Sequence, residues 1–238
     1  AGVGGLLGSL AIPWLTHRIH RRWVFTLGTL LVIAACALFT AEPRPGNGNL
    51  YRAIGYGNLD YLGAAPAAYA HPDYYFKESN AGLNDWSDLI GLTRTLNQTP
   101  TAEYAAAVAG VADAAEWVRF FAVNTLLANI ESTLSNPRVT PTSSNTIVVT
   151  GDYYLYRGSA NPRFRLLPYD LDSCLGVEGV SSVQLAVYPF LKVPAIARFF
   201  GEPAFASRYH EELRRLADTV FAPEQVNALL DRLLVPHI

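Results

Sequence analysis

The sequence lacks the features that identify several common protein classes. Its two cysteines, Cys36 and Cys174, are too few for a disulfide framework, and Cys36 lies within an apolar run. A formal net charge of −2 gives no electrostatic footprint for nucleic acid. No Gly-x-x-x-x-Gly-Lys-Ser/Thr phosphate loop, Gly-x-Ser-x-Gly elbow or Cys/His metal spacing occurs. These absences argue against a nucleic-acid partner, a P-loop enzyme, an α/β-hydrolase and a zinc module.

Acidic residues are absent from the N-terminal stretch that ends at Ala41. Residues 1–16 are apolar and rich in glycine, a basic cluster occupies His17–Arg22, and Trp23–Ala41 carries no charge. An uncharged apolar run of about 20 residues can span a bilayer. We therefore expect residues 1–41 to form a membrane helix hairpin, which makes the membrane a partner. The positive-inside rule places the chain that follows on the extracytoplasmic side.

Other interpretations of this N-terminal stretch remain open. Arg21-Arg22 and Trp23–Ile33 could form a signal peptide, with Cys36 as the lipidated residue of a bacterial lipobox. Residues 1–41 could instead form a buried hairpin of a soluble protein. The pattern from Gly8 to Arg22 weakly resembles the loop between two helices of major facilitator transporters, which would make the chain a transporter fragment. The membrane-hairpin and lipoprotein interpretations both export the rest of the chain.

The remainder of the chain has the composition of an ordinary globular domain. Residues 42–49 are dense in turn-forming residues and predict a linker, which leaves residues 50–238 as the domain. Strands are predicted in four segments: Tyr74–Lys77, Thr146–Thr150, Asp152–Arg157 and Arg163–Leu167. The last two form an antiparallel hairpin, whereas residues 135–149 have the Pro-, Ser- and Thr-rich composition of a mobile loop.

Helices account for most of the predicted domain. A helix is expected to begin with Asn84 or Asp85 as its N-cap and to end before Pro100. A longer amphipathic helix is expected over residues 114–128, and three more helices after Tyr188. The predicted fold is α+β, mainly helical with a small antiparallel hairpin, and a membrane helix hairpin precedes it.

Two carboxylates follow the second strand of the predicted hairpin. Leu166 and Leu167 lead into Pro168, and Asp170 and Asp172 come directly after. On an extended segment residues two apart face the same side, so both carboxylates could reach one cation. Mg²⁺ prefers oxygen ligands and takes one or two carboxylates together with substrate phosphate. The alternative is that one aspartate caps a turn and the other is solvated.

A further acid lies at the end of the long predicted helix. Asn129 and Glu131 place an amide carbonyl and a carboxylate there, a pair suited to positioning a metal or a hydroxyl group. The alternative is a surface glutamate in a frayed helix terminus. The residues alone therefore do not decide between the functional and the structural interpretation of either segment.

Six segments together resemble the CotH family of spore-coat protein kinases. They occur in the family's order: Gly48–Tyr51, Tyr75–Asn80, Asn84–Leu89, Asn129–Ser132, Asp152–Tyr156 and Leu167–Asp172. The resemblance covers about residues 49–238. It implies an atypical, eukaryotic-like kinase fold that transfers the γ-phosphate of ATP to Ser or Thr of a protein substrate, with Mg²⁺ or Mn²⁺ as the metal.

The resemblance also implies roles for individual residues. Asp170 would hold the metal, as the aspartate of the Asp-Phe-Gly motif does in ordinary kinases. Glu131 occupies the position of the catalytic-loop acid, and Asp172 and Glu131 are further candidate metal ligands. Asn129 and Asp152 are the candidate cofactor-binding residues. The protein substrate would be a surface or coat protein, on the bacterial cell surface or in the spore coat.

Three departures from the family pattern bear on activity. Glu131 stands where the family has Asp, and Asp152 stands where the family has Asn. The stretch before Asn49 does not resemble the family's N-lobe, which supplies the glycine-rich cover and the nucleotide-holding lysine. We therefore expect a truncated, C-lobe-like domain that is inactive without an N-lobe. A non-catalytic, membrane-tethered module for coat or cell-surface assembly is the alternative.

Overall fold

The computed structural model describes residues 48–129, 134, 138–141, 146–149, 151–169 and 189–234. They belong to one compact unit that runs from Pro45 to Ile238. Across these residues no helix combines the length and apolarity needed to cross a membrane. Residues 1–47 lie outside the described part, so the membrane hairpin, the lipobox at Cys36 and the linker over residues 42–47 stay predictions. The predicted linker ends too late, because its last residue, Asn49, is the first residue of a strand.

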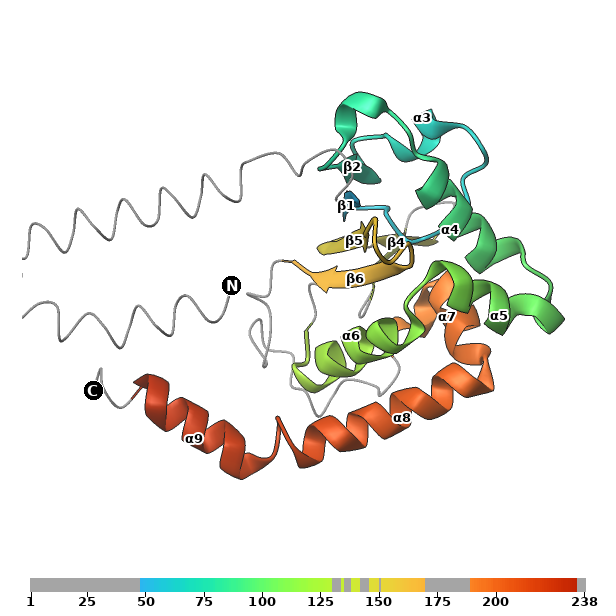
Figure 1. Cartoon of the computed structure of the whole chain (residues 1–238). Helices are drawn as coiled ribbons and strands as arrows, with labels where there is room; N and C mark the ends of the chain where they lie inside the picture. The colour runs from blue at the N-terminus through green and yellow to red at the C-terminus, as the bar shows by residue number, and fades with distance from the viewer. Residues whose placement is uncertain are drawn as a thin grey trace, which may run out of the picture. The chain divides into compact units, whose positions relative to one another are not determined.

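A four-stranded antiparallel sheet forms the centre of the domain (Figure 1). Its order is β2-β1-β5-β6, with bounds Tyr75–Lys77, Asn49–Ala53, Tyr153–Arg157 and Phe164–Pro168. The predicted hairpin is confirmed as β5 and β6, and the predicted strand near Tyr75 is confirmed as β2. The sheet is larger than the predicted hairpin, because β1 pairs with both β5 and β2.

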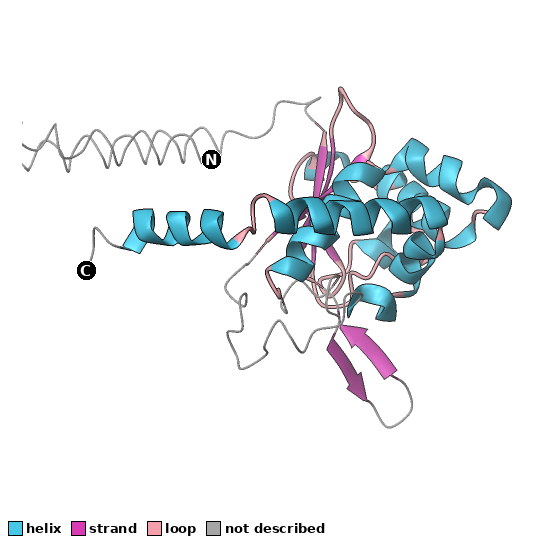
Figure 2. Ribbon diagram, turned by 90° about the horizontal axis from the view of Figure 1, so that it is seen from below, coloured by secondary structure: helices cyan, strands magenta, loops and turns pink. Residues whose placement is uncertain are grey.

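Alternation of side chains along the strands decides which face of the sheet is buried. On β5, Tyr153 and Leu155 are fully buried, and on β6 Phe164 and Leu166 are almost so, whereas the residues between them are more exposed. This period of two is the pattern of a strand with one face on a core. Most of the helices lie to the right of the strands in Figure 2, and their buried residues form one core cluster with those of the sheet.

Helices and short helical turns make up the rest of the domain. Their bounds are α3 Pro66–Tyr69, η1 Ala81–Leu83, α4 Ser87–Gln98, α5 Thr101–Val111, α6 Ala114–Leu126, η4 Pro189–Lys192, α7 Pro194–Gly201, α8 Pro203–Asp218 and α9 Pro223–Leu234. The long helix after residue 114 and the three C-terminal helices are confirmed. Phe121 of α6 contacts Phe190 and Phe200, at ring-centroid distances of 4.7 and 5.3 Å, which joins α6 to the C-terminal helices. The domain is therefore α+β, as the sequence predicts.

Several local features differ from the sequence prediction. Trp86, and not the predicted Asp85, is the N-cap residue of α4. Asp85 precedes it and still caps the helix with its side chain, because its Oδ1 accepts a hydrogen bond from the Ser87 N–H at 2.9 Å. Helix α5 was not predicted, because its alanine-rich sequence has little amphipathic contrast. The predicted strand at Thr146–Thr150 is confirmed as β4, Thr146–Val149. Its partner, β3, Arg138–Pro141, lies where a loop was expected (Figure 2).

An ion-pair network fastens α6 to α8 and should make stability depend on pH. Glu212 Oε1 lies 3.0 Å from Arg119 Nε and 2.7 Å from Arg215 Nη2. The hydrogen bonds from Arg215, and next those from Arg119, lower the pKa of Glu212 from 4.5 to about 2. A lowered folded-state pKa gives stability that is present above pH 4.5 and is lost as the pH falls toward 2.

Glu212→Gln is therefore expected to lower the free energy of unfolding by up to about 1 kcal/mol at pH 7. The loss relative to wild type should shrink between pH 5 and pH 2, because the wild-type carboxylate becomes protonated there. Urea unfolding midpoints across this pH range provide the measurement. Glu211→Gln, one position earlier on the same helix, is the matched control. An equal deficit at pH 7 and pH 2 would contradict the ion-pair explanation.

Candidate functional site

The open end of the β5–β6 hairpin, opposite its turn, carries two residues next to the predicted site. The register pairs Tyr153 with Pro168, so Asp152 and Tyr169 both lie at this end of the hairpin. Asp152 adopts the left-handed conformation with φ of 55°, which aspartate tolerates better than most residues. Before it, Gly151 is buried against the backbone of Gly55, where an added Cβ would lie only 3.1 Å from the nitrogen. The backbone that carries Asp152 is thus fixed by close packing.

Aromatic and cationic contacts hold Tyr169, the last described residue of this segment. Its ring makes an edge contact with Tyr154 at a centroid distance of 5.1 Å, and the Arg52 guanidinium lies 5.9 Å from its centroid. Arg52 also lies over the Phe76 ring and pairs with Glu78 at 2.9 Å. Burial, followed by the charges of Glu78 and Tyr169, raises the pKa of Tyr154. These contacts set the direction in which the chain leaves β6.

Asn129 is buried just beyond the end of α6, with 2% of its surface exposed. Its backbone N–H donates to Asn124 O at 3.0 Å, and its Nδ2 donates to Asn124 Oδ1 at 2.7 Å. Asn124 Nδ2 in turn donates to Phe120 O at 2.8 Å. Ala128 turns the chain there with φ of 51°. The Asn129 amide therefore fixes the path by which the chain leaves α6.

A pocket of about 250 Å³ lies between α6 and β6, and we call it the α6–β6 pocket. Its lining comes from both elements: Glu116, Arg119, Phe120, Val123, Asn124 and Leu127 from α6 and its end, and Leu166, Leu167 and Pro168 from β6. Asn124, which binds Asn129, and Pro168, which precedes Tyr169, thus line the same space. The end of α6 and the end of β6, each of which leads into a segment predicted to carry chemistry, therefore both line this pocket.

Three of the predicted site residues, Glu131, Asp170 and Asp172, fall outside the described residues, so their roles stay predictions. Asn129 and Asp152 are described and lie at the two ends just identified. In the described ranges no group of three or more His, Cys, Asp or Glu side chains is placed to hold a metal ion. Asp152 supplies a carboxylate beside the predicted metal segment, and oxygen donors of this kind suit Mg²⁺.

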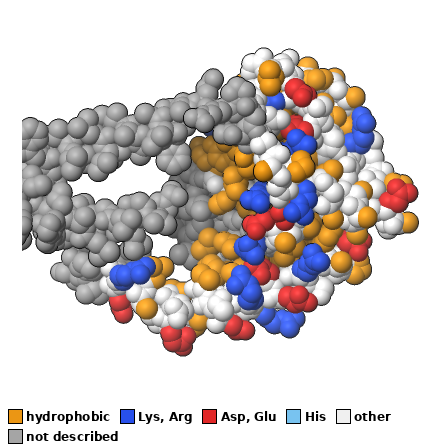
Figure 3. Space-filling model, viewed as in Figure 1, with side chains coloured by type: hydrophobic (Ala, Val, Ile, Leu, Met, Phe, Trp, Pro, Cys, Tyr) orange, Lys and Arg blue, Asp and Glu red, His pale blue; other side chains and the backbone are white. Residues whose placement is uncertain are grey.

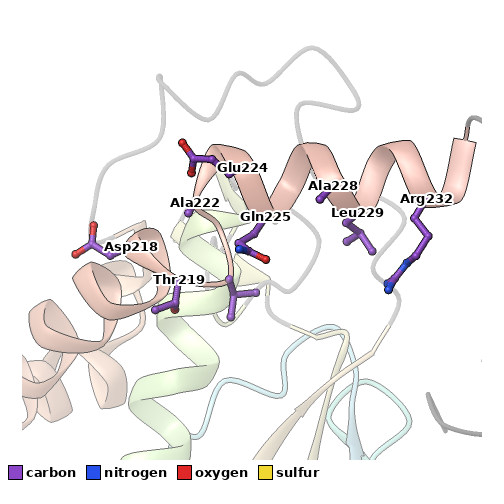
Figure 4. Close-up of a pocket in the computed structure, with 9 residues that line it drawn as sticks. Asp218, Thr219, Ala222, Glu224, Gln225, Ala228, Leu229 and Arg232 are labelled. Carbon is purple, nitrogen blue, oxygen red and sulfur yellow. The ribbon is translucent and has the colours of Figure 1, made fainter.

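A second, larger hollow of about 830 Å³ lies where α8 meets α9 (Figure 4). Asp218 and Glu224 flank one end of it and Arg232 the other, with Gln225 between them. Neither of the two described site residues, Asn129 and Asp152, lines this hollow. A third pocket, of about 270 Å³, lies at the turn end of the hairpin, where Asp88, Arg157 and Phe164 contribute to its lining. We take the α6–β6 pocket as the candidate site because the ends of α6 and β6 line it. Figure 3 shows basic and acidic side chains interspersed over this face of the molecule.

Sequence reasoning missed a polar network that joins β1 to α4. Asp88 accepts hydrogen bonds from Tyr51 Oη at 2.6 Å and from Asn49 Nδ2 at 2.7 Å. Burial, and then the adjacent Asp88, raises the pKa of Tyr51 well above its usual value. Ser79 accepts from the Leu50 N–H at 2.8 Å. The sequence did hold an indication that these residues belong together, because they come from three of the six segments that carry the family resemblance.

Comparison with protein families shows to which family the chain belongs. The family described as CotH kinase protein matches residues 41–234. The chain belongs to the CotH kinase family. No curated protein matches the chain, and the suggested likeness of residues 1–41 to transporters has no support from these comparisons.

Membership of the CotH family supports a kinase-like function. The match covers both segments that end at the α6–β6 pocket. The match begins at Ala41, the last residue of the predicted hairpin and one residue before the predicted linker. In a CotH protein, ATP and a divalent metal are the general cofactors to consider, and a protein is the general kind of substrate.

Proposed function

We propose that the domain transfers the γ-phosphate of ATP to a Ser or Thr hydroxyl of a surface or coat protein on the extracytoplasmic side. The observation that carries the proposal is the meeting, at the α6–β6 pocket, of the end of α6 and the end of the β5–β6 hairpin. Phosphoryl transfer depends on positioning and on neutralising charge, and carboxylates at rigid chain ends can do both.

Each predicted residue has a distinct role in this proposal. Asp170 and Asp172 hold Mg²⁺ or Mn²⁺, and the metal neutralises phosphate charge when it is bound. Glu131 orients the acceptor hydroxyl and accepts its proton. Asp152, at the rigid start of β5, adds a carboxylate beside the metal segment. Asn129 holds the backbone that leads to Glu131, through its two bonds to Asn124.

The test is the stabilisation of the full chain by ATP and Mg²⁺. At a nucleotide concentration ten times Kd, binding contributes about 1.4 kcal/mol. For a domain of this size that corresponds to a rise in Tm of roughly 3 to 6 °C. A thermal melt with ATP·Mg²⁺, compared with ATP and EDTA, measures it. Absence of any shift with either Mg²⁺ or Mn²⁺, up to millimolar ATP, contradicts the proposal.

A non-catalytic module for coat or surface assembly is the second candidate, and Glu131 is the observation in its favour. Glutamate is one methylene longer than the family's aspartate and would place its carboxylate further from the backbone. If the site has degenerated, Glu131→Asp should raise phosphate transfer to a generic Ser/Thr protein at least tenfold. If Glu131 works as it stands, the same change should lower transfer. Incorporation of γ-labelled phosphate distinguishes these outcomes.

A further inference from the structure

The outer edge of β6 presents backbone groups beside the α6–β6 pocket. Phe164 O accepts hydrogen bonds from the Asp113 N–H and the Trp117 indole, each at 2.9 Å, so the backbone groups of Phe164 point away from β5. Alternate residues of an antiparallel strand direct these groups to the same side. The N–H and C=O of Leu166 and the C=O of Pro168 therefore also point outward. Among the described residues none pairs with them.

Such an edge can bind a further strand. An extended peptide adds to an exposed sheet edge through main-chain hydrogen bonds, and pockets for its alternate side chains give specificity. Leu166 is only 4% exposed, and backbone groups in a shielded place gain from a hydrogen-bonding partner. Described residues pair with this edge only at Phe164, through the bridge to Ala112, so the stretch without a described partner runs from Leu166 to Pro168. The site therefore suits a short peptide segment.

The pocket selects the side chain that lies opposite Leu166. Residues directly opposite on neighbouring strands place their side chains on the same face. That face holds Leu166, and beside it Phe120, Val123 and Leu127 of α6 form an apolar wall. A volume of about 250 Å³ accommodates one aliphatic side chain.

Charge selects the neighbouring residue of the peptide. Its side chain points to the opposite face, which carries Arg165 and Leu167. Arg165, with 45% of its side chain exposed, and Arg163, with 43% exposed, share the single carboxylate of Asp113 at 3.9 and 3.4 Å. Within the described ranges these two guanidinium groups have one carboxylate between them, which leaves a net positive charge at this point of the surface. An acidic side chain complements it.

We propose that the edge of β6 binds an extended segment of a protein substrate, in which an aliphatic residue is followed or preceded directly by an acidic one. The aliphatic side chain fills the α6–β6 pocket and the acidic one pairs with Arg165. The assignment to a substrate, as distinct from another partner, rests on the proposed phosphotransfer. The binding of the peptide itself does not.

Labelled nine-residue peptides, added to the full chain without nucleotide, test the proposal. One peptide carries Leu-Glu at its centre in a Thr/Ser background, and a second carries Leu-Lys. Fluorescence anisotropy should show at least tenfold tighter binding of the Leu-Glu peptide. Arg165→Glu should reverse this preference, a result that simple unfolding cannot give. N-methylation of one alternate set of peptide amides should abolish binding, while methylation of the other set is tolerated.

The pocket is tested by Val123→Lys, which should weaken binding of both peptides at least tenfold. Val220→Lys is the matched control, because Val220 is 61% exposed and lies outside the pocket; it should leave affinity within twofold. Absence of binding at millimolar peptide overturns the proposal, as do equal effects of the two methylated sets or an unchanged preference in Arg165→Glu. If the peptides bind but ATP·Mg²⁺ gives no stabilisation, the edge site stands and its assignment to a substrate is overturned.

Discussion

Asp170→Ala is expected to remove the stabilisation of the chain by ATP·Mg²⁺. Loss of a residue that only supports a metal ligand costs 10- to 100-fold in metal affinity, so loss of a ligand should cost on the order of 100-fold or more. The same thermal melts should then show no shift at nucleotide concentrations that stabilise the wild-type chain. Phosphate transfer should fall with the binding, because charge on the phosphates is no longer neutralised.

Asp231→Ala is the matched control for this change. Asp231 is exposed on α9, a helix that contributes nothing to the α6–β6 pocket. The Asp231→Ala variant should be stabilised by ATP·Mg²⁺ to the same extent as the wild-type chain. A wild-type response in Asp170→Ala would show that nucleotide binds elsewhere and would remove the main argument for the proposed catalytic segment.

Trp117→Ala is expected to have the largest effect on stability. Trp117 is fully buried on α6, lies 5.6 Å from Phe199 between ring centroids, and donates its indole N–H to Phe164 O at 2.9 Å. Truncating a buried aromatic side chain of this size costs about 3–5 kcal/mol. That is a large part of the stability of roughly 5–15 kcal/mol that a domain has. Urea unfolding midpoints should fall accordingly.

Two further variants separate packing from hydrogen bonding at this position. Trp117→Phe keeps an aromatic ring and loses the N–H, so it should cost about 1–3 kcal/mol. Phe76→Ala removes a ring that is 42% exposed at the other edge of the sheet and should cost much less. A loss below about 1 kcal/mol in Trp117→Ala would mean that α6 does not anchor β6 in the way described.

The sequence predicted those elements whose pattern is local. Alternating residues and the turn at Gly158–Pro162 specify the β5–β6 hairpin, and helical periodicity specifies α6. The pairing of β1 with β5 could not be predicted, because it joins Asn49 to Arg157 across most of the domain and no local pattern encodes it. Helix α5 was missed for a different reason, since its buried residues, Tyr104 and Val108, are separated by alanines that fit any face.

The candidate site was predicted only in part, for a physical reason. The family resemblance implied Asn129 and Asp152 as candidate cofactor-binding residues, and the structure places them just beyond the end of α6 and just before β5. The spacing of residues in the sequence could not predict the α6–β6 pocket. Residues such as Val123 and Leu166 look like ordinary core positions in sequence, and only the packing of α6 against β6 turns them into the wall of a cavity.

The central position of β1 has a mechanical consequence. The chain enters the domain at Gly48 and becomes at once a strand that is bonded on both sides, to β2 and to β5. The Gly48 carbonyl is also held by Ser79 Oγ at 3.0 Å and Asn80 Nδ2 at 2.9 Å. A pull on the preceding segment, directed along the strand, loads the hydrogen bonds of both ladders together rather than opening one pair after another. The domain can therefore bear tension at its N-terminal attachment without first losing its outer strands.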